Sequence, residues 1–186
     1  MMVRCFAALA LPEPVRVIAT QQLEALRLLD WPVRWVRPEG MHLTLKFYGE
    51  VPAERVETLA ESLRFAAEGI GPLTLSLGGL GAFPSLRRAR ALWLGLEGPP
   101  ALEILQDRVE RRAEELGYAP EGSVFRPHVT LGRVREGMML PVGAEALFGE
   151  AATDVSGMVE QVTLYQSEPG PGGARYAALH EVSLRG

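Results

Sequence analysis

The sequence repeats one strand–helix–strand unit, and each copy ends in a His-x-Thr motif. The apolar strands that open the copies are Cys5–Leu9 and Ala91–Leu96, and the motifs begin at His42 and His128. Phe6 precedes the first motif histidine by 36 residues, and Leu92 precedes the second by the same distance. This order predicts an α+β fold with two lobes related by a pseudo-twofold axis. Two antiparallel sheets would line a central cleft, with the helices on their outer faces.

Hydrophobic periodicity places the remaining elements along the chain. Helices are predicted at Glu13–Leu29, Pro52–Ala67 and from Pro99–Pro100 to Gly117, with a short helical turn at Ala144–Phe148. Strands are predicted at Val3–Leu11, Val33–Val36, Met41–Tyr48, Leu73–Leu80, Ala89–Glu97, His128–Val134, Val159–Gln166 and Tyr176–Leu184. No long linker interrupts this order, so we expect residues 1–186 to form a single domain of two intimately packed lobes.

Side chains alternate along a strand, which assigns a face to each residue of the first motif strand. One face carries His42, Thr44 and Lys46. The other, predicted to anchor the core, carries Leu43, Leu45 and Phe47. The second motif strand repeats the pattern with His128, Thr130 and Gly132 on one face, whereas Arg133 breaks the apolar face formed by Val129 and Leu131.

The paired motifs are more specific than a single histidine, which in a strand is more often structural. The chain has 3 His and 7 Thr, and two of the three His have Thr two positions later. By residue frequency this is roughly a one-in-several-hundred coincidence. Two imidazoles facing one another suit general acid and base catalysis at phosphorus. The threonine hydroxyls can stabilise charge on the phosphate oxygens.

Other chemistries lack their motifs. Two histidines alone make an incomplete zinc site, and the sequence contains no HExxH, no GxxxxGK[ST] and no GxSxG. The single cysteine, Cys5, lies in an apolar strand pattern and is predicted to be a buried thiol, not a nucleophile. His180 has Val182 in place of a threonine and is predicted to be structural. No metal and no cofactor are expected.

The segments around both motifs resemble the 2H phosphoesterases. Trp35–Val51 is similar to the first motif of the bacterial and archaeal RNA 2′,3′-cyclic phosphodiesterases, also called 2′-5′ RNA ligases, and Phe125–Arg133 is similar to the second. Arg4–Leu9 resembles the opening strand of that family, and Leu164–Ser167 with Arg175–Tyr176 resembles its closing hairpin. The resemblance runs nearly from end to end.

The resemblance implies a bilobal fold and metal-independent hydrolysis of RNA 2′,3′-cyclic phosphate ends to 2′-phosphomonoesters, with reversible 2′-5′ ligation in some members. By position, His42 would donate a proton to the leaving 3′ oxygen, and His128 would accept one from water. Thr44 and Thr130 would hold the phosphate, and Arg133 matches a basic position that helps to bind it.

The acidic net charge of −4 weighs against binding long nucleic acid and favours an RNA terminus or a small cyclic nucleotide. No apolar run is long enough to span a bilayer. Met1–Leu11 is the only candidate for a targeting segment, and its apolar stretch, Cys5–Leu11, is too short for the core of a secretory signal. We therefore expect a cytoplasmic protein with no membrane partner, and a monomer.

Several assignments stay open from the sequence. Lys46 could contact substrate or solvent, and Arg87, Arg88 and Arg90 could form a solvated loop or contact RNA. Trp35, Phe83, Tyr165 and Tyr176 could belong to the core or stack on a base. The alternatives to the enzyme are a non-catalytic module that binds RNA ends or nucleotides, and a 2H enzyme for another substrate, such as ADP-ribose cyclic phosphate.

Overall fold

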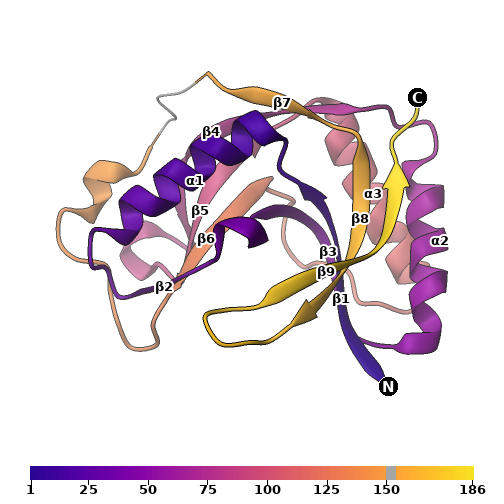
Figure 1. Ribbon diagram of the computed structural model, residues 1–186, viewed down its shortest axis with the longest axis horizontal. Helices are drawn as coiled ribbons and strands as arrows, with labels where there is room; N and C mark the ends of the chain where they lie inside the picture. The colour runs from indigo at the N-terminus through magenta and orange to yellow at the C-terminus, as the bar shows by residue number, and fades with distance from the viewer. Residues whose placement is uncertain (150–153) are drawn as a thin grey trace.

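A curved antiparallel sheet forms the frame of the computed structural model, which describes residues 1–149 and 154–186 (Figure 1). Its strands follow the order β7-β4-β5-β6-β3-β1-β8-β9, and β2 pairs with β6. The strands are β1 (Met2–Ala10), β2 (Val33–Trp35), β3 (His42–Pro52), β4 (Leu73–Phe83), β5 (Ala91–Glu97), β6 (His128–Val134), β7 (Ser156–Val159), β8 (Gln161–Glu168) and β9 (Arg175–Ser183). The helices are α1 (Glu13–Arg27), α2 (Val56–Ala67) and α3 (Pro100–Glu115).

The mixed fold with two antiparallel halves confirms the predicted fold class. One half contains β3, β1, β8 and β9, and the other contains β7, β4, β5, β6 and β2. In the described part of the chain, the two predicted sheets are joined into one by a single β-bridge between Leu43 of β3 and Val129 of β6. The bridge therefore lies at the centre of both His-x-Thr motifs.

Two of the three helices, α1 and α3, pack against the half opposite to the strand that they follow. α1 follows β1 but packs against β4 and β7, whereas α3 follows β5 but packs against β3 and α2 (Figure 1). The buried face of α1 contains Val15, Ala19, Leu23 and Leu26, spaced by the three or four residues of a helical turn. Because α1 and α3 each complete the core of the opposite half, we infer that the two lobes form one folding unit.

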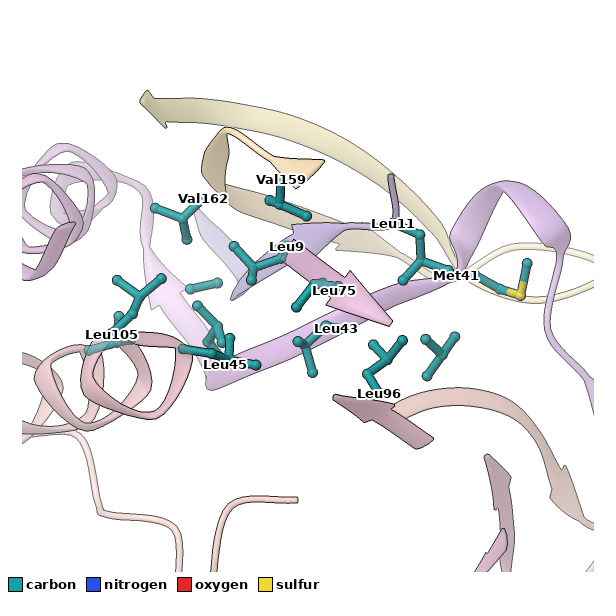
Figure 2. Close-up of a cluster of buried hydrophobic side chains, with 14 of the residues drawn as sticks. Leu9, Leu11, Met41, Leu43, Leu45, Leu75, Leu96, Leu105, Val159 and Val162 are labelled. Atoms are coloured by element: carbon teal, nitrogen blue, oxygen red, sulfur yellow. The ribbon is translucent and has the colours of Figure 1, made fainter. Parts of the chain in front are cut away.

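One hydrophobic cluster contains side chains from both halves (Figure 2). Leu43 and Val162 contribute to it from one half, and Leu75 and Val159 contribute from the other.

Among the described residues, no helix is long and apolar enough to cross a bilayer.

Each motif strand contains a bulge at the same place. β1 pairs Ala8 with Thr44 but Ala7 with Lys46, which leaves Leu45 as the extra residue. In the other half, Trp93 pairs with Thr130 and Leu92 with Gly132, so the extra residue there is Leu131. A bulge of this kind turns the following side chains to the opposite face of the strand.

The bulges overturn part of the alternation predicted for these strands. Phe47, predicted to be in the core, is 54% exposed, and Lys46, predicted to share the face of the motif histidine, is 2% exposed. Arg133 does not interrupt the apolar face, because the bulge turns it toward the cleft. The pairing also makes Ala7, and not Phe6, the counterpart of Leu92, so the two copies differ in spacing by one residue.

A substitution of Leu43 measures how much burial at the central bridge stabilises the fold. Its side chain is 0% exposed, so Leu43→Ala should lower the free energy of unfolding by about 2–5 kcal/mol through lost contacts and a cavity. Urea denaturation followed by circular dichroism measures this change. Leu28→Ala is the matched control, because Leu28 is 86% exposed and should change stability little. Equal effects of the two variants on the free energy of unfolding would contradict the conclusion that burial of Leu43 stabilises the bridge.

Candidate active site

The β-bridge brings the two His-x-Thr motifs together at their middle residues. Continuing the antiparallel register by one residue on each side sets His42 opposite Thr130 and Thr44 opposite His128. The two histidines therefore lie on a diagonal, each facing a threonine of the other motif. All four side chains line one cavity of about 600 Å³.

Both imidazoles are oriented by the same backbone contact. His42 Nδ1 lies 2.6 Å from the carbonyl oxygen of Gly40, and His128 Nδ1 lies 2.6 Å from that of Arg126. A carbonyl oxygen only accepts hydrogen bonds, so each Nδ1 must carry a proton and donate it. Each Nε2 is then the nitrogen that can gain or lose a proton in the cavity.

The site lowers the pKa of both histidines. For His42, burial is the main cause, and the nearby charge of His128 adds to it, while the hydrogen bond to Gly40 opposes both. For His128, burial again dominates and the charge of Arg133 adds to it, against the hydrogen bond to Arg126. Burial and a neighbouring positive charge both disfavour the imidazolium form. A bound phosphate anion would favour it.

Aromatic rings enclose each histidine. Phe6 and Tyr176 lie with ring centroids 4.8 and 5.1 Å from that of His42, and Phe83 lies 5.0 Å from that of His128. Of the four aromatic candidates from the sequence, Phe83 and Tyr176 line the cavity. Tyr165 instead stacks on Phe6 at 5.3 Å, and Trp35 packs against the core.

Of the arginines predicted to bind phosphate or RNA, only Arg133 lies at the cavity. Arg133 lines the cavity, and its charge acts on His128 and on the hydroxyl of Tyr176, whose pKa is raised mainly by burial. Arg87, Arg88 and Arg90 are exposed and are not among the residues that line the cavity. The structure thus brings together the two histidines, the two threonines and Arg133, but not the arginine run.

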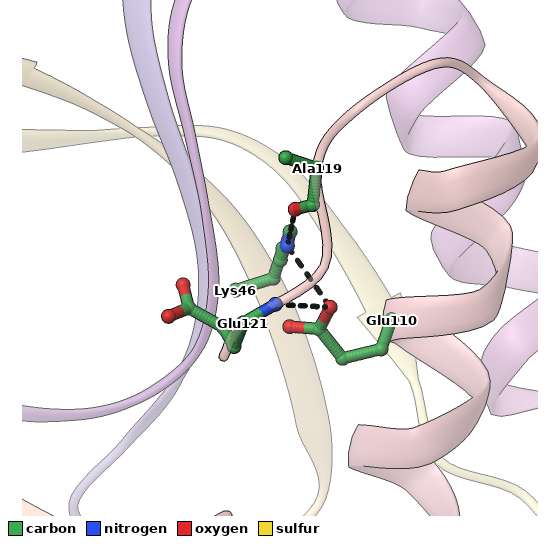
Figure 3. Close-up of polar contacts among 4 residues, drawn as sticks. All are labelled: Lys46, Glu110, Ala119 and Glu121. Carbon is green, nitrogen blue, oxygen red and sulfur yellow. Dashed lines mark hydrogen bonds and ion pairs between the residues drawn. The ribbon is translucent and has the colours of Figure 1, made fainter. Parts of the chain in front are cut away.

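Lys46 makes a buried polar network at the wall of the cavity (Figure 3). Its Nζ donates to Glu110 Oε2 at 2.9 Å and to the carbonyl oxygen of Ala119 at 2.6 Å. The backbone N–H of Glu121 donates to the same carboxylate oxygen at 3.4 Å. The network ties β3 and α3 to the segment that leads to Arg126, whose carbonyl holds the second histidine. The ammonium group of Lys46 is therefore held by Glu110 and Ala119, and its side chain, 1% exposed, is not directed to solvent.

Sequence reasoning missed three features of this site. Nothing in the motifs points to the carbonyl groups of Gly40 and Arg126, because backbone partners carry no residue signature. Phe47 reaches the cavity only because of the bulge at Leu45. One weak signal for Lys46 was available, since it is the single lysine in a chain with 18 arginines.

Across residues 1–149 and 154–186, no group of three or more His, Cys, Asp or Glu is placed to hold a metal ion. Cys5 is buried, as its strand pattern predicts. His180 Nε2 lies 3.4 Å from Glu57 Oε2, and His180 does not line the cavity.

A match to a known family identifies the chain. The family model described as LigT-like phosphoesterase matches residues 9–93 and 95–176, and each matched segment contains one His-x-Thr motif. The chain belongs to the LigT-like phosphoesterase family. The resemblance to 2H phosphoesterases inferred from its motifs is thereby confirmed.

Relatives of this LigT-like phosphoesterase match over nearly the whole chain. The RNA 2′,3′-cyclic phosphodiesterase of Methanothermobacter thermautotrophicus is 33% identical over 185 residues, covering 99% of this chain and 100% of the relative. That of Thermotoga maritima is 30% identical, covering 98% and 96%. A crystal structure from Thermus thermophilus superposes with a TM-score of 0.82 at 28% identity, covering 98% of both chains. E. coli LigT complexed with 3′-AMP superposes with a TM-score of 0.75 at 30% identity, covering 99% of both.

The buried network predicts a strong effect of Lys46→Met on stability. This change leaves the Glu110 carboxylate, whose side chain is only 14% exposed, without its cation, which should cost about 3–5 kcal/mol of unfolding free energy. Chemical denaturation of the wild type, Lys46→Met and Lys46→Met/Glu110→Leu measures it. The double variant should recover part of the loss, because the unpaired charge is gone. A double variant less stable than Lys46→Met would contradict the assignment.

Proposed function

We propose that this LigT-like phosphoesterase hydrolyses 2′,3′-cyclic phosphate ends of RNA to 2′-phosphomonoesters without a metal ion. The observation that carries the proposal is the diagonal pair of histidines, each with Nε2 free for proton transfer and each facing a threonine hydroxyl. The relatives support the substrate, since those of Methanothermobacter thermautotrophicus and Thermotoga maritima are RNA 2′,3′-cyclic phosphodiesterases. The bound 3′-AMP of E. coli LigT supports binding of a nucleotide.

The reaction follows from the positions of the two imidazoles. Neutral His128 takes a proton from water through Nε2 while the water oxygen attacks phosphorus. The bond from phosphorus to the 3′ oxygen breaks, and protonated His42 donates its Nε2 proton to that oxygen. The hydroxyls of Thr44 and Thr130 donate hydrogen bonds to the non-bridging oxygens, and Arg133 offsets their charge. Proton exchange with water then restores both histidines.

The same geometry allows ligation. A 5′-hydroxyl in place of the water would form a 2′-5′ linkage, and cleavage of that linkage would exchange the roles of the two histidines. One chain supplies both motifs, so a monomer contains a whole site. We expect the protein to act in the cytoplasm, where RNA ends are processed.

Hydrolysis of a cyclic-phosphate-ended oligoribonucleotide in excess EDTA tests the proposal. Wild type should yield the 2′-phosphate, and His42→Ala and His128→Ala should each lose about a hundredfold or more in rate, because each removes a proton-transfer group. His180→Ala is the matched control and should keep wild-type activity. If wild type is inert, or active only after metal is added, the proposal fails, and affinity for RNA ends becomes the test of a binding module.

The lowered histidine pKa values predict the pH dependence of kcat/KM for the free enzyme. The active form has His42 protonated and His128 neutral, so activity should peak below about pH 6.5 and fall as the pH rises and His42 loses its proton. On the acid side it should fall as His128 becomes protonated. Initial rates on a cyclic mononucleotide over a pH series measure this profile.

The variant Arg133→Gln tests the assignment of the acid limb, the fall of kcat/KM at low pH, to His128. It removes a positive charge that lowers the pKa of His128, so the acid limb should move to higher pH even as overall activity decreases. A wild-type profile that rises steadily to pH 9, or an acid limb that moves to lower pH in the variant, would contradict the assigned roles.

A further inference from the structure

A second arginine lies beside Arg133 on the cleft face of the sheet. β2 lies along β6 (Figure 1). Arg34 is directly opposite Arg133, and directly opposite residues of paired strands point to the same face. The neighbours of Arg34 confirm its direction, because Val33 is buried and Trp35 packs against the core. Arg34 is exposed. Arg34 is not among the residues that line the cavity, but it lies one strand, about 5 Å, from Arg133, which does line it.

This pairing of like charges is unfavourable in the protein alone. Two cations directly opposite on paired strands destabilise the sheet. In the described part of the chain, neither Arg34 nor Arg133 forms an ion pair, whereas Arg27, Arg64 and Arg111 each pair with a carboxylate. An anion bound between the two guanidinium groups would remove the repulsion, and a phosphate matches the planar fork of arginine.

We propose that Arg34, beside Arg133, forms a second phosphate subsite, which binds the internucleotide phosphate on the 5′ side of the terminal nucleotide, with Arg133 shared between this phosphate and the cyclic phosphate. This inference rests on the proposed function, since it assumes a cyclic phosphate held by the two motifs. Single-stranded nucleic acid is commonly bound by a positively charged groove that follows its backbone. The subsite makes the oligonucleotide a better substrate than the cyclic mononucleotide, which has no second phosphate. It also provides a local cationic track on a chain of acidic net charge.

The test compares a 2′,3′-cyclic mononucleotide with a four-residue oligoribonucleotide that ends in a 2′,3′-cyclic phosphate. Arg34→Gln should lower kcat/KM on the oligonucleotide about tenfold, mainly through KM, as expected for the loss of a charged hydrogen bond. It should leave the mononucleotide rate unchanged. The logarithmic salt dependence of kcat/KM on the oligonucleotide should become less steep by about 0.7, the value for one phosphate contact to a single strand.

Arg16→Gln is the matched control, because Arg16 is an exposed arginine of α1, on the opposite side of the sheet, and forms no ion pair in the described residues. This variant should change kcat/KM on neither substrate. Arg34→Lys, which keeps the charge, should retain most of the oligonucleotide rate.

The outcomes separate this inference from the proposed function. If wild type hydrolyses both substrates but Arg34→Gln affects both equally, or neither, the subsite is refuted and the phosphodiesterase activity stands. A wild type that prefers the mononucleotide also refutes the subsite. If wild type hydrolyses neither substrate, the proposed function fails and the subsite fails with it.

Discussion

The single β-bridge between Leu43 and Val129 is the constraint on which the site depends. Among the described residues it is the one backbone pairing between β3 and β6, and it lies between the histidine and the threonine of each motif. The side chains that flank it point into the cleft, whereas Leu43 and Val129 themselves are fully buried. Burial of these two residues thus sets the distance between two proton-transfer groups that are 86 residues apart in the chain.

The pseudo-twofold repeat gives both motifs the same surroundings, and small differences make the two halves unlike. Each histidine has a carbonyl partner two residues earlier, and each motif strand has a bulge after the threonine. The bulge turns Phe47 into the cavity on one side and Arg133 on the other. At equivalent places the two copies thus present a phenyl ring and a guanidinium group to the cavity, which suits a substrate with a nucleoside and a phosphate backbone.

The sequence predicted the elements and the motif residues well because both depend on local signals. Helical and strand periods gave α1, α3 and β5 within two residues, and the repeated His-x-Thr pattern gave the four side chains that meet in the cavity. The side-chain directions of Lys46, Phe47 and Arg133 were missed. They depend on bulges, and a bulge is decided by pairing with a strand far away in the sequence. The exchange of helices between the halves is non-local for the same reason.

The two similar histidines have different roles in proton transfer, and a change of leaving group tests this difference most directly. In a substrate whose 3′ oxygen is replaced by sulfur, the thiolate leaves without a proton, so a general acid becomes dispensable. Rates of cleavage in EDTA would be measured for wild type, His42→Ala and His128→Ala on the oxygen and sulfur substrates. We expect the defect of His42→Ala to shrink about a hundredfold on the sulfur substrate while that of His128→Ala persists. The opposite pattern would reverse the two roles, and full defects of both variants on sulfur would contradict the acid–base account.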